Sequence, residues 1–332
     1  MKRWLCGILV ALLLLCGGCV GEGQETSLYQ NLSNFVSEFE VRAEDINQAF
    51  AEVFAEHPEL QVYLGKVSIQ SAKTRHIVEV EYQNQSIDPS SIVCGSGEKA
   101  MRKGVLATLE AVEKRGVVVL QSQKEQPDPH TFMDTLREKE YLAVMGLSTS
   151  EWSFVTNDFT SDMVVLYDFS YDQMASQLLE NRNKTRAEVE RLSAELWTED
   201  TDPQSRVRAI HDYLVQYTEY AELEEVDDHT AYNVLVNGRG VCDGYTYAAH
   251  LLLKAAGIES MVALGMATGE EHAWNVVKLD GNYYHMDVTW DDPVGAGEQM
   301  TVYDYYLVGD ATLQKDHTWE GDIPACPSDY KQ

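Results

Sequence analysis

Apolar and polar residues alternate with two different periods in the first part of this 332-residue chain. Between residues 32 and 54 the apolar positions recur at helical spacing and stop before a His-Pro pair, which predicts one helix. The next two segments, VYLGKVSIQ and HIVEVEYQ, alternate apolar and polar residues and predict two strands.

The middle of the chain carries further elements of both kinds. A helix over residues 98–115, the apolar run GVVVL and the alternating segment MVVLYDF are predicted, with QPDPH near 126–130 marking a loop. Together with the first elements they predict a small α/β domain over residues 31–170. This region carries no catalytic signature, so we expect it to recognise or position another molecule.

Two helices are predicted to lead into the C-terminal part of the chain. Thr185 and Glu188 have the spacing of a capping box, which predicts a helix that starts there and ends near Trp197. Asp202 followed by Pro203 predicts the start of the next helix. The apolar stripe of that helix is formed by Val207, Ile210 and Leu214.

Glycines surround Cys242 in the segment GRGVCDGYTYAAH. From Tyr245 onward, apolar residues recur at helical spacing until Gly257, so Cys242 is predicted to open a buried helix. A thiol at that position faces unpaired backbone N–H groups and the positive end of the helix dipole, and both favour the thiolate. The sequence therefore predicts a reactive cysteine.

A β-hairpin is predicted around Asp280-Gly281, a strong two-residue turn signal between two strand-like segments. With these two residues as the loop, Trp274 faces Asp287 across the hairpin. His272 and Asp287 are then diagonal neighbours on one face, about 7–8 Å apart between backbones, a distance that their side chains can close. A slip of one residue would place them on opposite faces.

Four segments of the C-terminal part resemble, in sequence and order, the bacterial transglutaminase-like superfamily, whose members are relatives of papain-type thiol enzymes. The segments are IHDYLVQYTEY, AYNVLVNGRGVCDGYTYAAHLLLKAAGI, HAWNVVKLDGNYYHMDVTWDDP and YDYYLVGD. The resemblance implies that Cys242 is the catalytic nucleophile, His272 its base and Asp287 the orienting carboxylate. It also implies an α+β, papain-like cysteine protease domain over residues 171–332, with the nucleophile at a helix N-terminus packed on an antiparallel sheet.

The resemblance implies a thiol enzyme that acts on amide bonds of proteins or peptides through a thioester. Hydrolysis is favoured over transamidation because water is always present. The superfamily also includes members without activity, so a non-catalytic module that binds proteins or cell-wall peptides is the alternative. An arylamine N-acetyltransferase, which also uses a thiol triad, is disfavoured because export would separate it from coenzyme A. No cofactor is expected.

Other polar and aromatic residues are weaker candidates. His211, His250 and Trp274 are interpreted as packing or hydrogen-bonded residues, with Trp274 shielding the site or packing beneath it. Tyr232 is interpreted as a core tyrosine or, by analogy with relatives, an oxyanion donor. The backbone N–H of Cys242 is the better oxyanion candidate, because amides at a helix start point toward developing negative charge.

No metal site is predicted. Zinc bound by Cys242, His272 and His285 fits poorly, because His285 lies well down the predicted hairpin from the other two residues. The adjacent acids Asp291 and Asp292 are a weak calcium signal, because no further alternating oxygen ligands accompany them.

The N-terminus has the layout of a secretory signal. Two basic residues precede the apolar run LCGILVALLLLCGGC, which is too short for a stable membrane span and ends in small residues. This ending resembles a bacterial lipoprotein processing box, so residues 1–18 are predicted to be removed and Cys19 to carry a lipid anchor. Residues 19–30 would be the lipidated cysteine and tether, on the outer side of the cell membrane; without lipidation the protein would be secreted.

Charge and cysteine usage fit an extracytoplasmic protein. The net charge of −29 repels nucleic acid and anionic lipid head groups, so membrane attachment is expected through the lipid alone. Cys94 and Cys326 are candidates for a disulfide that ties the C-terminal tail to the front domain, with two unpaired buried thiols as the alternative.

Overall fold

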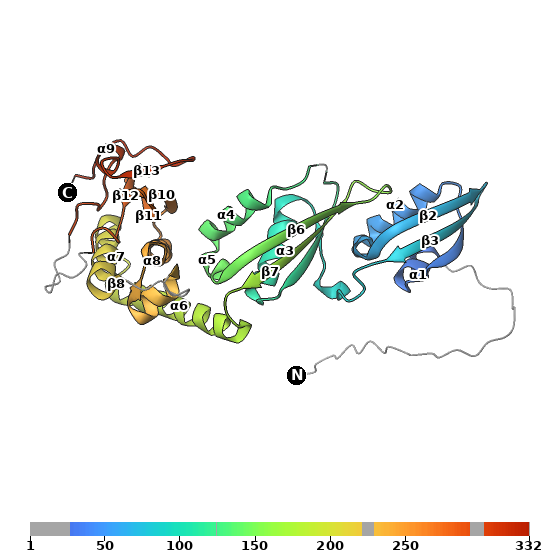
Figure 1. Cartoon of the computed structure of the whole chain (residues 1–332), viewed down its shortest axis with the longest axis horizontal. Helices are drawn as coiled ribbons and strands as arrows, with labels where there is room; N and C mark the ends of the chain where they lie inside the picture. Colours follow the sequence, from blue (N-terminus) through green and yellow to red (C-terminus); the bar gives the residue numbers. More distant parts are fainter. Residues whose placement is uncertain (1–26, 124, 221–228, 293–301, 332) are drawn as a thin grey trace. The chain divides into compact units, whose positions relative to one another are not determined.

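The structure, a computed structural model, describes residues 27–123, 125–220, 229–292 and 302–331. The chain divides into two compact units, Met1–Ser86 and Ile87–Gln332 (Figure 1). The predicted domain boundary between residues 170 and 171 falls inside the second unit. That residues 31–170 and 171–332 are separate domains stays a prediction. The predicted signal segment 1–18 and Cys19 lie outside the described residues. Among the described residues, no helix has the length and apolar character needed to cross a membrane.

The first unit contains a three-stranded antiparallel sheet in the order β1–β3–β2. Its elements are α1 (Leu28–Ser33), β1 (Glu38–Arg42), α2 (Ile46–Glu56), the 3₁₀ helix η1 (Pro58–Tyr63), β2 (Leu64–Ala72) and β3 (Arg75–Tyr82). The two predicted strands are confirmed as β2 and β3. Alternate residues of β3 are buried, including His76, Val78 and Val80, while Ile77 and Glu79 between them are exposed.

The single helix predicted over residues 32–54 is wrong, because a strand interrupts it. α1 ends at Ser33, and the Asp45 side chain accepts the N–H groups of Asn47 and Gln48 at the start of α2. Between the two helices, β1 pairs with β3. Pairing with β3 satisfies the backbone groups that a helix would have satisfied internally, so a distant partner outweighs the local helical spacing.

The second unit begins with the short 3₁₀ helix η2 (Pro89–Ser91) and a four-stranded sheet in the order β4–β5–β7–β6. The strands are β4 (Val93–Gly95), β5 (Arg115–Leu120), β6 (Leu147–Thr156) and β7 (Met163–Tyr171), with helices α3 (Gly97–Glu110), α4 (Pro129–Lys139) and α5 (Tyr141–Val144). The predicted helix is confirmed as α3, and GVVVL and MVVLYDF as β5 and β7. The predicted loop is wrong at its end, because Asp128 caps α4 and Pro129 occupies its first turn.

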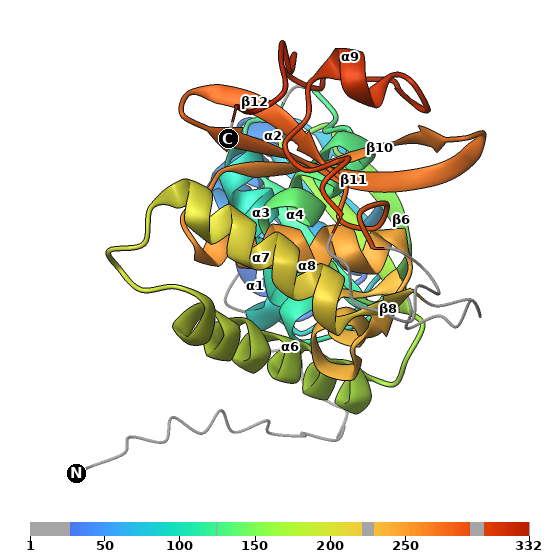
Figure 2. The same ribbon diagram turned by 90° about the vertical axis from the view of Figure 1, so that its left-hand side faces the viewer.

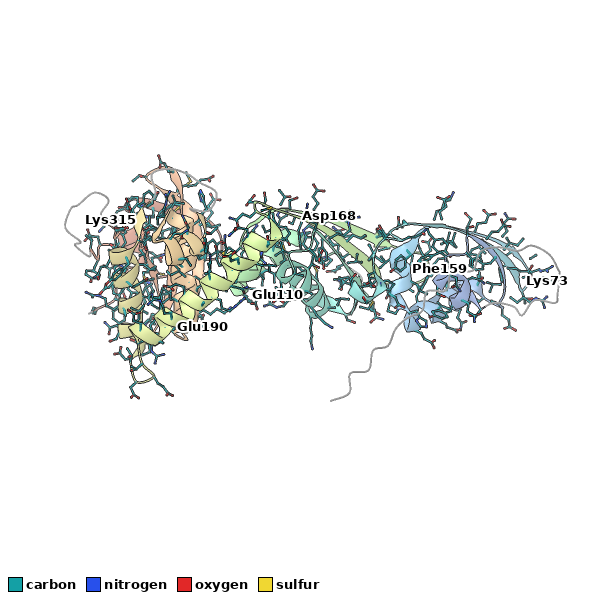
Figure 3. All side chains as sticks on the ribbon, turned by 90° about the horizontal axis from the view of Figure 1, so that it is seen from below. Lys73, Glu110, Phe159, Asp168, Glu190 and Lys315 are labelled. Atoms are coloured by element: carbon teal, nitrogen blue, oxygen red, sulfur yellow. The ribbon has the colours of Figure 1, made fainter. Side chains whose placement is uncertain are left out.

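The long helix α6 (Ala175–Leu196) starts well before the predicted capping box, which is therefore wrong. Thr185 is buried inside the helix, where its hydroxyl donates to the carbonyl of Asn181 at 2.8 Å. One turn earlier, the buried Arg182 guanidinium donates to the backbone carbonyls of Leu109 and Met145. These contacts fix the buried face of the N-terminal half of α6. The other face of the helix is exposed, and Glu190 projects from it to solvent (Figure 3).

The next helix, α7 (Pro203–Tyr217), starts where predicted. The Asp202 side chain accepts the N–H of Ser205 at 2.9 Å, and Pro203 occupies the first turn. The predicted stripe of Val207, Ile210 and Leu214 is fully buried. α6 and α7 both pack on α8 (Cys242–Ala255), as Figure 2 shows.

The second unit contains another four-stranded sheet, which is antiparallel throughout and has the order β12–β11–β10–β13. Its strands are β10 (Ser260–Ala267), β11 (Glu270–Leu279), β12 (Asn282–Met286) and β13 (His317–Trp319), and α8 packs on β10 and β11. The remaining elements are β8 (Glu219–Tyr220), the π-type turn η4 (Asn233–Asn237), β9 (Arg239–Gly240) and α9 (Asp310–Leu313). A helix that opens at Cys242 on an antiparallel sheet confirms the predicted α+β, papain-like fold class.

Candidate active site

Cys242 is the first residue of α8, as predicted. Gly238 turns the chain with a φ of 72°, β9 pairs in parallel with β8, and Val241 is extended before the helix begins. The first N–H groups of a helix have no acceptor within it, and the helix dipole is positive at this end. Cys242 is partly exposed at this position, so its sulfur is open to an approaching molecule.

The β11–β12 hairpin has the predicted register. Its loop residues Asp280 and Gly281 have φ values of 52° and 81°, the left-handed backbone of a type I′ turn. From this turn the pairing runs up the ladder to Asn275 and Met286. Asp287 follows directly after β12, so the turn sets which face of the hairpin it occupies.

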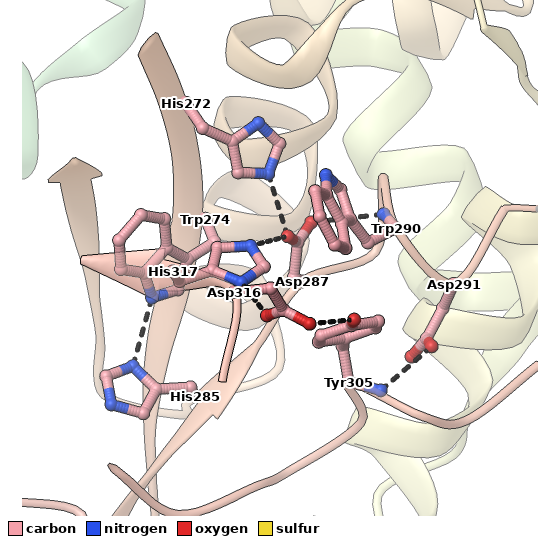
Figure 4. A network of polar contacts seen from close by, with 9 residues as sticks. All are labelled: His272, Trp274, His285, Asp287, Trp290, Asp291, Tyr305, Asp316 and His317. Atoms are coloured by element: carbon pink, nitrogen blue, oxygen red, sulfur yellow. Dashed lines mark hydrogen bonds and ion pairs between the residues drawn. The ribbon is translucent and has the colours of Figure 1, made fainter. Parts of the chain in front are cut away.

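The hairpin brings His272 and Asp287 together. His272 Nε2 lies 2.7 Å from Asp287 Oδ2, and the Asp287 side chain is completely buried (Figure 4). The backbone N–H of Trp290 donates to the other carboxylate oxygen at 3.2 Å. The carboxylate is thus fixed from two sides, and the predicted contact between diagonal neighbours is present.

His272 also interacts with the Cys242 sulfur. Burial lowers the pKa of His272, but the hydrogen bonds of its ring to Asp287 and Cys242, with charge attraction to both, outweigh burial and raise the pKa to about 9. Since Nε2 faces Asp287, Nδ1 is the ring atom left for the sulfur. At neutral pH this arrangement favours an imidazolium beside the Cys242 sulfur.

A second histidine, His317, reaches the same carboxylate and was missed by sequence reasoning. Its Nε2 lies 3.1 Å from Asp287 Oδ2, and its Nδ1 lies 2.6 Å from Asp316 Oδ1 (Figure 4). The Tyr305 hydroxyl donates to the other oxygen of Asp316 at 2.7 Å. The only signal in the sequence was the adjacent Asp-His pair, and adjacency alone does not indicate what a residue reaches.

β13 carries His317 to the site because Gly265 allows a close approach. Gly265 of β10 pairs with Trp319 of β13 on one side and with His272 of β11 on the other. A Cβ atom at this glycine would lie 2.2 Å from the carbonyl oxygen of Thr318 and 2.8 Å from the Trp274 ring. Only glycine therefore fits between the ring and the neighbouring strand.

Trp274 lies beneath the site, as interpreted from the sequence. Its ring is buried, and its indole N–H donates to His285 Nδ1 at 3.0 Å, while His285 Nε2 faces Asp310 at 3.0 Å. An indole N–H only donates, so His285 Nδ1 must accept and His285 is neutral with its proton on Nε2. Burial lowers the pKa of His285, which agrees with this state.

This tautomer also argues against zinc at His285. The structure places potential ligand atoms of His285, Asp310 and Cys326 within 4.8 Å of one another. A zinc-bound imidazole coordinates through one nitrogen and donates from the other, but His285 accepts at Nδ1 and would have to coordinate through its protonated Nε2. The hydrogen bonding of this group therefore does not fit a metal.

Asp291 and Asp292 have protein partners. Asp291 accepts from His211 Nε2 at 3.0 Å and from the backbone N–H of Tyr305 at 2.9 Å. Asp292 accepts from the Tyr245 hydroxyl at 2.6 Å. These bonds use the carboxylates to join α7, α8 and the loop after β12, a structural role.

The other weak candidates are structural as well. His250 is buried, with ring nitrogens 2.9 Å from the Ser260 hydroxyl and 2.7 Å from the Glu138 carbonyl. Tyr232 packs against the core and lines a cavity of about 180 Å³ together with Tyr141 and Tyr247, and its oxyanion role stays a hypothesis. Cys326 is a buried free thiol, so the candidate disulfide with Cys94 is absent from this structure, and the alternative of two buried thiols holds for Cys326 only, because Cys94 is exposed.

Comparisons with known proteins found similar sequences for part of this chain. Residues 190–288 match the family model of the transglutaminase-like superfamily, and the match includes the helix start at Cys242 and the β11–β12 hairpin. The kyphoscoliosis peptidases of mouse and human are each 27% identical to this chain, over 135 and 154 residues. These matches cover 36% and 39% of this chain and 20% and 23% of the relatives, so the chain spans about a fifth of the length of the curated relatives it matches.

A crystal structure of a TGase is 13% identical, with a TM-score of 0.30, over 75% of this chain and 72% of that chain. The segment matched by the family model, residues 190–288, contains Cys242, His272 and Asp287.

Proposed function

We propose that the C-terminal domain is a thiol enzyme that acts on amide bonds of proteins or peptides through a thioester on Cys242. The observation that carries this proposal is the continuous chain of contacts from a partly exposed helix-start thiol to His272 and on to the buried Asp287. A structural cysteine would have no need of an oriented, ionised base.

In the first half-reaction, the Cys242 thiolate attacks the carbonyl carbon of an amide and forms the C–S bond. The carbonyl oxygen becomes an oxyanion, which the N–H of Cys242 is placed to stabilise. When the C–N bond breaks, the His272 imidazolium gives its proton to the leaving nitrogen, which departs as ammonia or an amine. The acyl group stays on the sulfur as a thioester.

In the second half-reaction, the now neutral His272 takes a proton from water while the water oxygen attacks the thioester. The C–S bond breaks, a carboxylic acid leaves, and the thiolate–imidazolium pair is restored. An amine in place of water would give a new amide. Asp287 holds the imidazole in the required orientation throughout and stabilises its charged form. We favour hydrolysis, because water reaches a partly exposed site without a dedicated binding site.

Three products distinguish the possible reactions, and one assay can score them separately. Glutamine-bearing peptides are supplied with and without a primary amine. Ammonia without amine incorporation indicates a deamidase, incorporation indicates a transamidase, and new peptide termini indicate a peptidase. Cys242→Ala is the control, and any product that it still forms does not come from this site.

The non-catalytic binding module is the outcome that would replace this proposal. It would be supported if the wild type and Cys242→Ala were indistinguishable on broad peptide and cell-wall libraries while both bound the same surface ligand. A single product that depends on Cys242 would exclude it.

We further propose that residues 1–18 are a signal peptide and that Cys19 carries a lipid anchor on the outer face of the cell membrane. Support comes from the short apolar run that ends in Gly-Gly-Cys. Expression of the full chain should give protein in the membrane fraction that becomes soluble on Cys19→Ala. Wild-type protein found wholly in the medium, or unprocessed in the cytoplasm, would contradict the anchor.

A further inference from the structure

The Asp287 carboxylate serves two imidazoles. His272 and His317 both reach its Oδ2 atom, at 2.7 and 3.1 Å, from strands on opposite sides of β10. The side chains of Asp287 and His317 are both fully buried. The proposed reaction needs one imidazole on this carboxylate, so it leaves His317 unexplained.

The partners of His317 restrict its hydrogen bonding. Both of its ring nitrogens face carboxylate oxygens, which only accept, and a neutral imidazole has one N–H. Donation to Asp287 and Asp316 at the same time requires the charged ring. The Tyr305 hydroxyl donates to the other carboxylate oxygen of Asp316, so the carboxylate that His317 contacts is itself fixed in position.

A chain of polar contacts then runs from the interior to the thiol. The sequence of groups is Asp316, His317, Asp287, His272 and Cys242. A buried carboxylate is costly unless donors surround it, and each donor that favours the ionised form also fixes its direction.

We propose that His317 is a positioning residue that keeps Asp287 ionised and turned toward His272, so that the thiolate–imidazolium pair persists at mildly acidic pH. This role rests on the proposed function, because it acts through the same triad. His317 does not touch the reacting atoms in this scheme.

The pKa of Asp287 supports this role. Burial would raise the pKa of Asp287, but hydrogen bonds from His272 and then His317 outweigh it and lower the pKa below its ordinary value. The other titratable groups facing the pair are Asp316, His285, Asp291 and Tyr305. Since His317 is one of two side chains that donate to Asp287, its removal should let Asp287 take up a proton at higher pH.

The test measures how fast Cys242 reacts with iodoacetamide between pH 4 and 9, using peptide mapping to follow this one cysteine. Alkylation needs no substrate, so it reports on the ion pair alone. For His317→Leu, we expect the rise in rate with pH to move up by about one unit, which is about a tenfold lower rate at pH 5. The rate at pH 8 should stay within about twofold of the wild type.

His317→Gln replaces the imidazole by a neutral amide that can still donate a hydrogen bond. It also keeps the test possible if His317→Leu does not fold. Its amide can still donate to Asp287 but carries no charge, so the profile should move in the same direction by a smaller amount. His285→Gln is the matched control, because His285 is equally buried but contacts Trp274 and Asp310 in place of Asp287. Its alkylation profile should stay where the wild-type profile lies.

An Asp287→Asn background tests whether His317 acts through Asp287. With no carboxylate to keep ionised, His317→Leu should add no further shift to the profile. An equal shift in both backgrounds would overturn the proposed role.

The outcomes distinguish this role from the proposed function. Wild-type Cys242 that reacts no faster near pH 6 than free cysteine would remove the activated thiol, and both proposals would fall. A wild-type profile shifted to low pH, with unmoved profiles in folded His317 variants, would overturn only the role of His317. A uniform fall in rate at every pH would also overturn it, because a merely structural residue would act in that way.

Discussion

Among the described residues, two groups of one cysteine, one histidine and one aspartate gather beside the β11–β12 hairpin, and their hydrogen bonds differ. The first group is Cys242, His272 and Asp287, and the second is Cys326, His285 and Asp310. Both histidines lie on the β11–β12 hairpin. The same residue types therefore occur twice, and their hydrogen-bond partners make the difference.

The difference lies in what faces each imidazole. His272 faces a carboxylate on one side and a thiol on the other, so its charged form is favoured and its pKa is raised to about 9. Burial lowers the pKa of His285, and its Nδ1 accepts from the Trp274 indole, a hydrogen bond that only the neutral ring can make. His272 is a candidate base because a carboxylate accepts its hydrogen bond, whereas His285 is a structural residue because the Trp274 indole donates to it.

The largest expected effect concerns the two aspartates. Asp287→Asn should lower kcat/KM by about 10⁴-fold, because the amide misdirects the His272 tautomer while the fold is kept. Asp310→Asn makes the same change beside His285 and should leave activity within a few fold. The measurement is product formation in the peptide assay above. Equal losses of activity in both variants would contradict the inference that Asp287 supports catalysis and Asp310 does not.

The two thiols should differ in reactivity by at least about 10²-fold at neutral pH. Burial and the nearby Asp310 raise the pKa of Cys326 to about 12, whereas Cys242 lies at a helix start beside an imidazolium. Limiting iodoacetamide followed by peptide mapping measures both cysteines in one sample, with urea-unfolded protein as the control for equal labelling. Preferential labelling of Cys326 would contradict the assignment of the nucleophile.

Trp274→Phe should lower the free energy of unfolding by about 2–4 kcal/mol, because it leaves the buried Nδ1 of His285 without a donor and removes packing volume. Trp152→Phe is the matched control, since its buried indole N–H has no hydrogen-bond partner among the described residues. That substitution loses similar volume but no hydrogen bond, so it should lower the free energy of unfolding by less. Urea unfolding at pH 8 measures both losses. Equal losses would show that the hydrogen bond from Trp274 to His285 does not contribute to stability.

The smallest expected effect is on the pH dependence of stability. Because the pKa of His285 is lower in the folded state, the unfolded chain binds a proton first, and stability is lost as pH falls through about 6.5. His285→Gln should flatten this loss by up to about 1.4 kcal/mol per unit of pKa shift. Urea unfolding at pH 8 and pH 5.5 gives the difference.

His211 provides the opposite sign for the same measurement. It lies between Asp212 and Asp291, and although burial lowers its pKa, the hydrogen bonds that its ring donates to both acids raise the net pKa above its ordinary value. Its contribution to stability is present below about pH 6.5 and is lost as pH rises through its folded pKa. His211→Gln should therefore cost more at pH 5.5 than at pH 8, the reverse of His285→Gln.

Local rules in the sequence determined the elements whose signals lie within a few residues of one another. The Asp280-Gly281 turn specified the hairpin register, and Asp202-Pro203 specified the start of α7. The glycine-rich segment before Cys242 placed that thiol at a helix start. A turn and a cap satisfy their own backbone groups, so they form without reference to the rest of the chain.

Tertiary structure decided what depends on a distant partner. Residues 38–42 became a strand because β3 lies beside them, and α6 starts early because its buried face meets Leu109 and Met145. His317 reaches Asp287, and Trp274 holds His285 neutral, only once four strands have assembled around Gly265. The sequence by itself thus predicted Cys242, His272 and Asp287 as the candidate site, while the fold decided the hydrogen-bond partners of each imidazole, because a hydrogen bond depends on positions in space that neighbouring residues do not encode.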